Sequence, residues 1–240
     1  MAPVADNEVV KIILTLLWVF GGLGLFLYGI ELMGNSLRKA AGTALRKSLN
    51  FLTRTRVHGL LTGTVITGLV QSSSATTVMV VGFISAGLLA FPQSMGLILG
   101  ANIGSTVTPQ ITAWDLDELA IPIIGIGFLL NFLSRRRVLR QFGLALMGFG
   151  MLFLGLVLMK LAVRGYSDVI KSSLEACTQG GIGGMLIAFF VSMVVTAVIQ
   201  SSAATVVMVQ ALALEGAVNG IGIAIPIIVG ANVGTCITAM

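Results

Sequence analysis

Two copies of one polar sequence carry the clearest chemical signal in this chain. Residues 71–80 read QSSSATTVMV and residues 200–209 read QSSAATVVMV; they agree at eight of ten positions and lie 129 residues apart. Their carboxamides and hydroxyls can donate and accept hydrogen bonds. His58 is the only histidine, which excludes most acid–base mechanisms and most transition-metal sites. The repeated segment therefore indicates a binding site, and we expect no enzymatic activity.

A second pair of polar segments follows the first at almost the same distance. Residues 100–108 read GANIGSTVT and residues 230–238 read GANVGTCIT. A weaker echo precedes both pairs, in which Gly24, Gly29 and Met33 correspond to Gly150, Gly155 and Met159. Three landmarks in the same order indicate a duplicated unit of about 126 to 130 residues.

The composition places this duplicated unit in a membrane. The chain is 56% hydrophobic and 10% charged, with a mean hydropathy of +1.03, whereas a soluble domain carries about 25% charged residues. The net charge of +5 does not indicate nucleic-acid binding, because the basic residues lie between apolar segments. Cys177 and Cys236 form no metal-ligand pattern and no disulfide scaffold. The sequence therefore predicts an all-α polytopic membrane protein embedded in the lipid bilayer.

The apolar segments divide the first unit into a crossing helix and a surface segment. Residues 9–33 are long enough to cross a hydrocarbon core of about 30 Å. Glu31, near the end of that segment, is either a functional intramembrane carboxylate or a side chain that simply reaches water. Residues 36–57 carry six basic and no acidic residues, at a spacing typical of an amphipathic helix on the membrane surface.

The first QSS segment is predicted to lie at the turn of a re-entrant hairpin. Only 12 apolar residues, 59–70, precede Gln71, and a helix of that length reaches about 18 Å, which is too short to cross. Irregular backbone at mid-membrane depth is tolerated where protein or a water-filled cavity surrounds it. Residues 95–113 are then predicted to cross as a helix whose middle is unwound at GANIGST, and residues 119–133 to cross back.

The charged loops predict that the second unit is inverted. Clustered Lys and Arg favour the cytoplasmic side, which places residues 36–57 and the basic loop 134–140 inside. The N-terminus and the acidic loop 115–118 are then outside, and residues 141–163 cross in the direction opposite to residues 9–33.

We therefore predict two inverted-topology repeats in the cytoplasmic (inner) membrane, each with a re-entrant helical hairpin and a broken transmembrane helix. The first repeat covers residues 1–133, including the basic amphipathic segment 36–57. Residues 134–140 form a basic cytoplasmic loop. The second repeat covers residues 141–240 and lacks a counterpart of the closing helix 119–133.

Inverted repeats with paired broken segments are typical of secondary transporters, whose substrate and ion sites lie between the repeats near the bilayer midplane. Helix N-termini and hydroxyls at the QSS tips suit an oxyanion, and unwound GAN segments suit a small hard cation. Neither motif contains Lys or Arg, so we expect cations to enter with the anion and neutralise it. The competing interpretation is helix packing, since Ser, Thr and Gly are common where membrane helices meet.

The candidate substrate- and ion-binding residues come from the four polar segments. They are Gln71, Ser72, Ser73, Ser74, Thr76, Asn102, Ser105, Thr106, Gln200, Ser201, Ser202, Thr205, Asn232 and Thr235. Within this set, the candidates for a sodium site are Ser73, Asn102, Ser202 and Asn232.

The doubled QSSSATT and QSSAAT segments, each followed about thirty residues later by GANIGST or GANVGTC, resemble the type II sodium/phosphate cotransporter family and its bacterial relatives. The resemblance covers residues 22–240. It implies sodium-coupled uptake of inorganic phosphate, with sodium as a co-transported ion and no cofactor. It also implies that both QSS tips lie at the phosphate and sodium sites, through Gln71, Ser72, Ser73, Ser74, Gln200, Ser201 and Ser202.

Two departures from the family pattern matter. Ala203 stands in place of the third serine of the second tip, which bears on the number or affinity of bound ions. The chain also stops at Met240, without a closing helix and without the PhoU-like domain that bacterial relatives often carry. This favours a fragment, or a shortened form that works as a homo-oligomer or with a PhoU-like partner.

The residues alone leave other functions open. A sodium-coupled carrier of another small oxyanion or of a carboxylate would share the same physical arguments, since phosphate rests on the family resemblance. A non-transporting membrane scaffold is the alternative from a different class.

Overall fold

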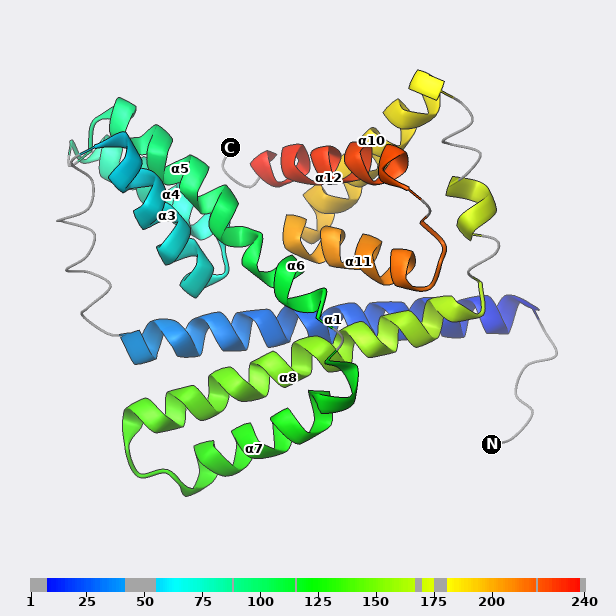
Figure 1. Ribbon diagram of the computed structural model, residues 1–240, viewed down its shortest axis with the longest axis horizontal. Helices are drawn as coiled ribbons and strands as arrows, with labels where there is room; N and C mark the ends of the chain where they lie inside the picture. The colour runs from blue at the N-terminus through cyan, green and yellow to red at the C-terminus, as the bar shows by residue number, and fades with distance from the viewer. Residues whose placement is uncertain are drawn as a thin grey trace.

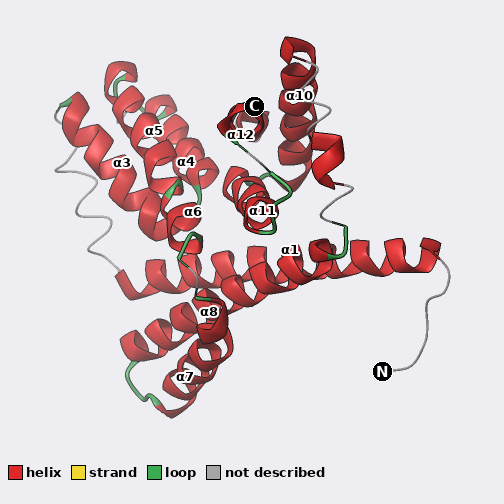
Figure 2. Cartoon of the chain, turned by 45° about the vertical axis from the view of Figure 1, so that its right-hand side comes forward, coloured by secondary structure: helices red, strands yellow, loops and turns green. Residues whose placement is uncertain are grey.

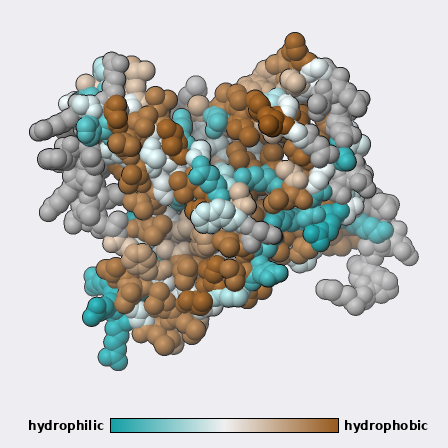
Figure 3. All heavy atoms as spheres, viewed as in Figure 1, coloured by the Kyte–Doolittle hydropathy of each residue, from teal (hydrophilic) through white to brown (hydrophobic). Residues whose placement is uncertain are grey.

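The computed structural model describes residues 8–41, 55–87, 89–114, 116–166, 170–174, 181–218 and 220–237, and every regular element in these ranges is a helix. Three helices, within 10–40, 137–164 and 181–199, are long and apolar enough to cross a membrane; a fourth span results if the bent pair 91–112 and 117–133 counts as one. Hydrophobic residues cover much of the visible face (Figure 3). The prediction of an all-helical chain with several candidate membrane spans is confirmed for the described residues.

The two longest described helices, α1 (Glu8–Ala41) and α8 (Arg137–Arg164), lie side by side and run in opposite directions (Figure 1). Glycines allow their backbones to approach closely. A Cβ atom on Gly22 would lie 2.8 Å from the carbonyl oxygen of Gly155, and one on Gly29 would lie 2.7 Å from that of Gly148. Gly148 and Gly155 are the repeat equivalents of Gly22 and Gly29, respectively. Gly22 therefore contacts the equivalent of Gly29, and Gly29 contacts the equivalent of Gly22.

The first half of the chain adds a group of three helices that carries the first QSS segment. The helix α3 (Arg56–Val70) packs along α5 (Phe91–Ser105), and α4 (Ser73–Ser85) also contacts α5. The contact between α3 and α5 is close: a Cβ atom on Gly100 would lie 2.1 Å from the carbonyl oxygen of Leu60. Any larger residue at position 100 would push the two helices apart.

The second half adds a corresponding group. The helix α10 (Gly181–Ile199) packs along α12 (Ile221–Cys236), and α11 (Ser202–Leu214) also contacts α12. A Cβ atom on Gly230, the equivalent of Gly100, would lie 2.3 Å from the carbonyl oxygen of Phe189. Both groups lie on the same side of α1 (Figure 2).

The largest cluster of buried apolar side chains fixes α11 to the pair of long helices. Its fully buried members include Phe26 on α1, Phe153 and Leu152 on α8, and Val207 on α11. This packing sets the position of the second QSS segment, which immediately precedes α11, relative to α1.

The GAN segments are helical, which corrects the prediction that they are unwound. The helix α5 continues through Asn102 to Ser105, and α12 continues through Asn232. Their glycines serve close helix contact, as described above, and do not let the backbone leave the helix. The chain departs from α5 only after Ser105. Pro109, in the short helix α6 (Val107–Thr112), has no N–H to donate to the carbonyl of Ser105, which explains the break.

The first helix is longer than predicted. It continues past Met33 to Ala41, so residues 36–41 of the predicted surface segment belong to α1. Arg38 and Lys39 lie in its last turn, where positive charge complements the negative end of the helix dipole. Residues 42–54 of that segment lie outside the described residues.

A sharp bend follows α6. A 3₁₀ turn, η1 (Asp117–Leu119), leads into α7 (Ala120–Leu133), which packs along α8 and makes an angle of 88° with the preceding helical segment. Lys160 is only 9% exposed, and its Nζ donates to Oδ2 of Asp117 at 2.7 Å. Asp117 thus partners a buried ammonium, while Asp115 of the predicted acidic loop lies outside the described residues. The helix α7 is about 21 Å long, so its separate crossing stays a prediction.

Candidate functional site

The first QSS segment forms a tight turn between α3 and α4. Gln71 has φ 59° and ψ 25°, in the left-handed region, and its N–H donates to the carbonyl of Thr67 at 2.7 Å. Ser72 is the N-cap of α4, because its Oγ accepts from the N–H of Ala75 at 3.2 Å. The predicted interruption of the helix at this segment is present, and it takes only two residues.

The second QSS segment repeats this geometry between α10 and α11. Gln200 also has φ 59°, and the Oγ of Ser201 accepts from the N–H of Ala204 at 3.3 Å. Gln71 and Gln200 are the only non-glycine residues with positive φ in the part of the chain that the structure describes. Such a backbone costs about 1–2 kcal/mol for a residue with a side chain, so glutamine at both positions points to a role for the carboxamide.

A pair of threonine hydroxyls closes each turn from behind. The Oγ1 of Thr67 donates to that of Thr76 at 3.0 Å, and the corresponding atoms of Thr196 and Thr205 lie 2.8 Å apart. All four side chains are buried. Thr76 and Thr205, which the sequence placed among the binding candidates, therefore hold the two helices of each turn together, and neither lines the two cavities described below.

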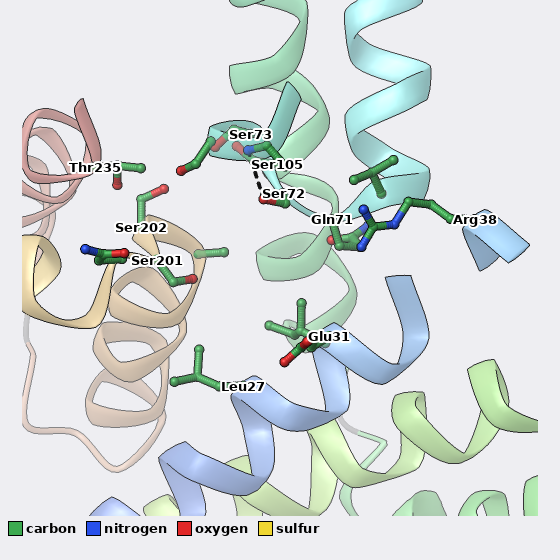
Figure 4. Close-up of a pocket in the computed structure, with 16 residues that line it drawn as sticks. Leu27, Glu31, Arg38, Gln71, Ser72, Ser73, Ser105, Ser201, Ser202 and Thr235 are labelled. Carbon is green, nitrogen blue, oxygen red and sulfur yellow. Dashed lines mark hydrogen bonds between the residues drawn. The ribbon is translucent and has the colours of Figure 1, made fainter. Parts of the chain in front are cut away.

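A cavity of about 320 Å³ lies between the two turns and α1 (Figure 4). This volume is at the small end of the range for ligand pockets. Its lining brings together nine of the predicted binding residues: Gln71, Ser72, Ser73, Ser74, Ser105, Gln200, Ser201, Ser202 and Thr235. The N-termini of α4 and α11, capped by Ser72 and Ser201, both open on this cavity, which we call the tip cavity.

A second cavity, also about 320 Å³, adjoins the first. Asn102 and Asn232 line it from α5 and α12. Ser73, Ser74, Ser202 and Thr235 line both cavities. The four sodium-site candidates therefore share this second cavity, which we call the asparagine cavity. Their hydroxyl and carboxamide oxygens are its candidate cation ligands.

Thr106 is the one remaining candidate, and the structure does not bring it to either cavity. Its exposed hydroxyl donates to the carbonyl of Ile103, in the preceding turn of α5, at 2.7 Å.

Two charged residues on α1 join the site: Glu31, for which the sequence left a functional and a solvent-exposed interpretation open, and Arg38, which sequence reasoning missed. Glu31 and Arg38 both line the tip cavity, and Figure 4 shows the guanidinium of Arg38 near Gln71 and the carboxylate of Glu31 turned toward the cavity. This corrects the expectation that the protein would offer an anion no positive charge. The expectation failed because it considered only the repeated motifs and ended the first helix at Met33, which separates Arg38 from the site.

Three further hydrogen bonds connect α6 to Gln71 at the site and to Gln210 on α11. The hydroxyl of Thr108 donates to Oε1 of Gln71. In the second half, Nε2 of Gln210 donates to the carbonyl of Pro109 at 3.0 Å, and its Oε1 accepts from Thr112 at 2.9 Å. A glutamine within an apolar helix needs such partners, so the sequence did carry a signal for Gln210. The α6 segment thus bonds to both halves of the chain.

Comparison with known proteins assigns a family. A sequence model described as Na+/Pi-cotransporter matches residues 25–161 and, a second time, residues 156–240. The chain belongs to the Na+/Pi-cotransporter family. The double match falls on the two halves that the repeated segments define, and the resemblance noted from the QSS and GAN motifs is confirmed.

Several relatives match most of this chain. The uncharacterized protein YqeW of Bacillus subtilis is 33% identical over 220 residues, which cover 90% of this chain and 69% of YqeW. The Escherichia coli protein named "Putative inorganic phosphate export protein YjbB" is 27% identical over 228 residues, covering 95% of this chain and 41% of YjbB. Rat sodium-dependent phosphate transport protein 2A is 34% identical over 97 residues, covering 40% of this chain and 15% of the rat protein. No solved structure matches the chain.

Proposed function

We propose that this chain carries inorganic phosphate across the cytoplasmic membrane by symport with sodium. The observation that carries the proposal is that Gln-Ser-Ser turns from both halves line one cavity, at the N-termini of α4 and α11. Helix N-termini attract oxyanions through unpaired N–H groups and the helix dipole. Membership of the Na+/Pi-cotransporter family supports phosphate and sodium as the ions.

Charge balance supports co-transport with a cation. Arg38 and Glu31 are the charged residues in the described lining of the tip cavity, and their formal charges cancel. Phosphate carries between about one and two negative charges at neutral pH. Burying that charge uncompensated costs far more than the roughly 1–2 kcal/mol that helix dipoles return. We place sodium where the tip cavity meets the asparagine cavity, because Ser73 and Ser202 line both and hard cations prefer neutral and anionic oxygen ligands.

Two inverted repeats would let this site open to each side of the membrane in turn. The antiparallel α1–α8 pair, with each glycine against the equivalent of the other, supports a two-fold relation between the halves. In this proposal α3–α4 and α10–α11 are re-entrant hairpins that enter from opposite faces, and the N-terminus is outside. The site then lies between the repeats, as in other secondary transporters.

The topology has a direct test. We expect single cysteines at Glu118 and at Arg136, both exposed, to react with impermeant reagents from opposite faces in a background where Cys177 and Cys236 are serine. Glu118 is the better external site, because a cysteine at Asp117 would remove the partner of Lys160. Labelling of both positions from the same face would rule out the inverted arrangement.

The direction of transport is a separate question, because the relatives' names differ. YjbB is named for phosphate export and the rat protein for sodium-dependent phosphate transport. A coupled carrier moves its substrate in the direction that the combined gradients favour, so we propose sodium coupling and leave the physiological direction to the gradients.

The decisive experiment is uptake of labelled phosphate by proteoliposomes that contain the purified chain. We expect uptake to require an inward sodium gradient and to stop when choline replaces sodium, with protein-free liposomes as control. Uptake that needs neither sodium nor protons would refute symport. Exchange of sulfate or a small carboxylate in place of phosphate would indicate a carrier of another anion. Absence of any substrate-dependent counterflow would favour the scaffold.

A further inference from the structure

Three polar residues form a strip along one face of α1. Glu31, Asn35 and Arg38 are spaced four and three residues apart, so they lie above one another on the helix. The Nδ2 of Asn35 donates to Oε1 of Glu31 at 3.4 Å, and the guanidinium of Arg38 donates to Oδ1 of Asn35. Asn35 thus links the two charged side chains.

Both charged ends of this strip reach the tip cavity. Glu31 and Arg38 line it together with both QSS turns, and both side chains are exposed to it rather than packed in the core. Seven residues of helix separate them by roughly 10 Å along the axis. The cavity is therefore bounded by a positive charge toward the C-terminal end of α1 and a negative charge two turns earlier.

We propose that α1 supplies the fixed charges of the transport site: the Arg38 guanidinium binds the substrate oxyanion, and the Glu31 carboxylate binds the co-transported cation. This inference rests on the proposed function and adds binding residues that lie outside the repeated motifs. Hydroxyls and carboxamides of the QSS turns line the same cavity and can contact both ions.

The chemistry of the two side chains fits this division. A guanidinium presents paired N–H donors that match two oxygens of one phosphate, which an ammonium cannot do. A carboxylate is a preferred oxygen ligand for hard cations. An anion and a cation that enter together are each attracted to one end of the cavity and repelled from the other, so the strip also sets the orientation of the bound pair.

The arrangement is asymmetric between the repeats. The repeat equivalents of Glu31 and Arg38, 126 positions later, are Val157 and Arg164. Arg164 pairs with Glu215 at 2.9 Å and does not line the tip cavity. Among the residues that the structure describes, α1 alone therefore brings charge to the lining of the tip cavity, although the two turns that form it are alike.

The test measures phosphate and sodium binding separately in four variants of the full chain. Purified protein in a maltoside detergent free of lipid is titrated with inorganic phosphate at saturating sodium, and with sodium at saturating phosphate. We expect Arg38→Gln to weaken phosphate binding by about ten- to a hundred-fold. Arg38→Lys keeps the charge but loses the paired donors, so we expect it to weaken phosphate binding by only about a few-fold. We expect Glu31→Gln to raise the half-saturating sodium concentration by about ten-fold.

The matched control for Arg38 is Lys39→Gln, which removes the same charge from the exposed neighbour in the same turn, outside the cavity. It should leave both affinities unchanged. Arg38→Lys retains the charge, so it reports on the site even if Arg38→Gln fails to fold.

The outcomes separate this inference from the proposed function. If the unmodified chain binds phosphate in a sodium-dependent way but Arg38→Gln and Arg38→Lys both match Lys39→Gln, Arg38 is no anion ligand; contact with a lipid headgroup would give this result. If the unmodified chain binds no phosphate at any sodium concentration, the proposed function itself fails. Unchanged sodium affinity in Glu31→Gln would remove the carboxylate from the cation site.

Discussion

The two QSS turns share their backbone geometry but differ in what surrounds them. Both have a glutamine at φ 59° followed by a capping serine. Gln71 is half-buried and bonded to Thr108, whereas Gln200 is exposed, and the equivalent of Thr108, Thr238, lies outside the described residues. Gln210 bonds across to α6, while its equivalent in the first half is the exposed Val81. Duplication thus preserved the turn itself, and each copy acquired its own neighbours.

The largest effects are expected at the two glutamines, which occupy the same position in both turns. We expect Gln71→Ala and Gln200→Ala each to reduce phosphate transport to the background of protein-free liposomes, because a bound ion would lose a carboxamide partner from either side. Loss of one such partner costs about 1–3 kcal/mol, or roughly ten- to a hundred-fold in affinity. Uptake assays at several phosphate concentrations measure the effect.

Stability should separate the two glutamines. Gln71→Ala leaves the Thr108 hydroxyl without its acceptor, so its thermal unfolding midpoint should fall, whereas that of Gln200→Ala should not. Gln71→Gly is the control, since glycine relieves the positive φ but still lacks the carboxamide; it should be more stable than Gln71→Ala and equally inactive. Normal uptake by either alanine variant would reduce the motif to helix packing.

Equivalent glycines in the two long helices should also behave differently. A Cβ atom on Gly150 would lie 2.7 Å from the carbonyl oxygen of Ala120 in α7, whereas nothing lies within 4 Å of one on Gly24. We expect Gly150→Ala to destabilise the protein by about 1–3 kcal/mol. Gly24→Ala should stabilise α1 by up to about 1 kcal/mol. Thermal unfolding in detergent compares the two, and equal shifts would show that α7 does not pack on α8 as described.

The sequence predicted the turns well because their signal is local. A Gln-Ser-Ser run inside an apolar segment cannot continue a lipid-facing helix without partners, and the structure interrupts the helix there. The GAN glycines were misread because their reason lies in another helix. The carbonyl oxygen of Leu60 fills the space beside Gly100, and nothing near Gly100 in the sequence reports that contact.

Arg38 was missed for a related physical reason. Its role depends on where α1 ends, and helix ends are set by caps and tertiary packing more than by hydrophobicity. Once α1 continues to Ala41, the spacing of Glu31, Asn35 and Arg38 places them on one face. The helical fold and the family could thus be read from repeated motifs, while the charged part of the site required the packing of α1 against both turns.

The buried threonine pairs should give similar, moderate effects in both repeats. Thr76→Val and Thr205→Val each remove a hydroxyl that bonds to a second threonine and to the carbonyl of the N-cap serine. Hydrogen bonds between membrane helices contribute about 0.6–2 kcal/mol, so we expect a loss of about 1–2 kcal/mol in each variant. Thr106→Val is the control, because in the described structure its exposed hydroxyl bonds only to near neighbours along the chain, the carbonyl of Ile103 at 2.7 Å and Nε2 of Gln110 at 3.4 Å. A large loss in one repeat alone would show that the turns are not equivalent.

The smallest expected effect concerns the fourth position of the repeated segment, which is serine in the first copy and alanine in the second. Ser74 and Ala203 are repeat equivalents, and both line the tip cavity. A single neutral hydroxyl contributes about 0.5–1.5 kcal/mol. We therefore expect Ala203→Ser to lower the half-saturating sodium concentration by roughly two- to ten-fold, and Ser74→Ala to raise it by a similar factor. Sodium dependence of phosphate uptake, measured in both variants and in the double variant, tests this.

If the double variant, which exchanges the hydroxyl between the tips, recovers the original sodium affinity, the two tips contribute interchangeably to the cation site. If Ser74→Ala has an effect that Ala203→Ser cannot offset, the cation is bound mainly by the first tip.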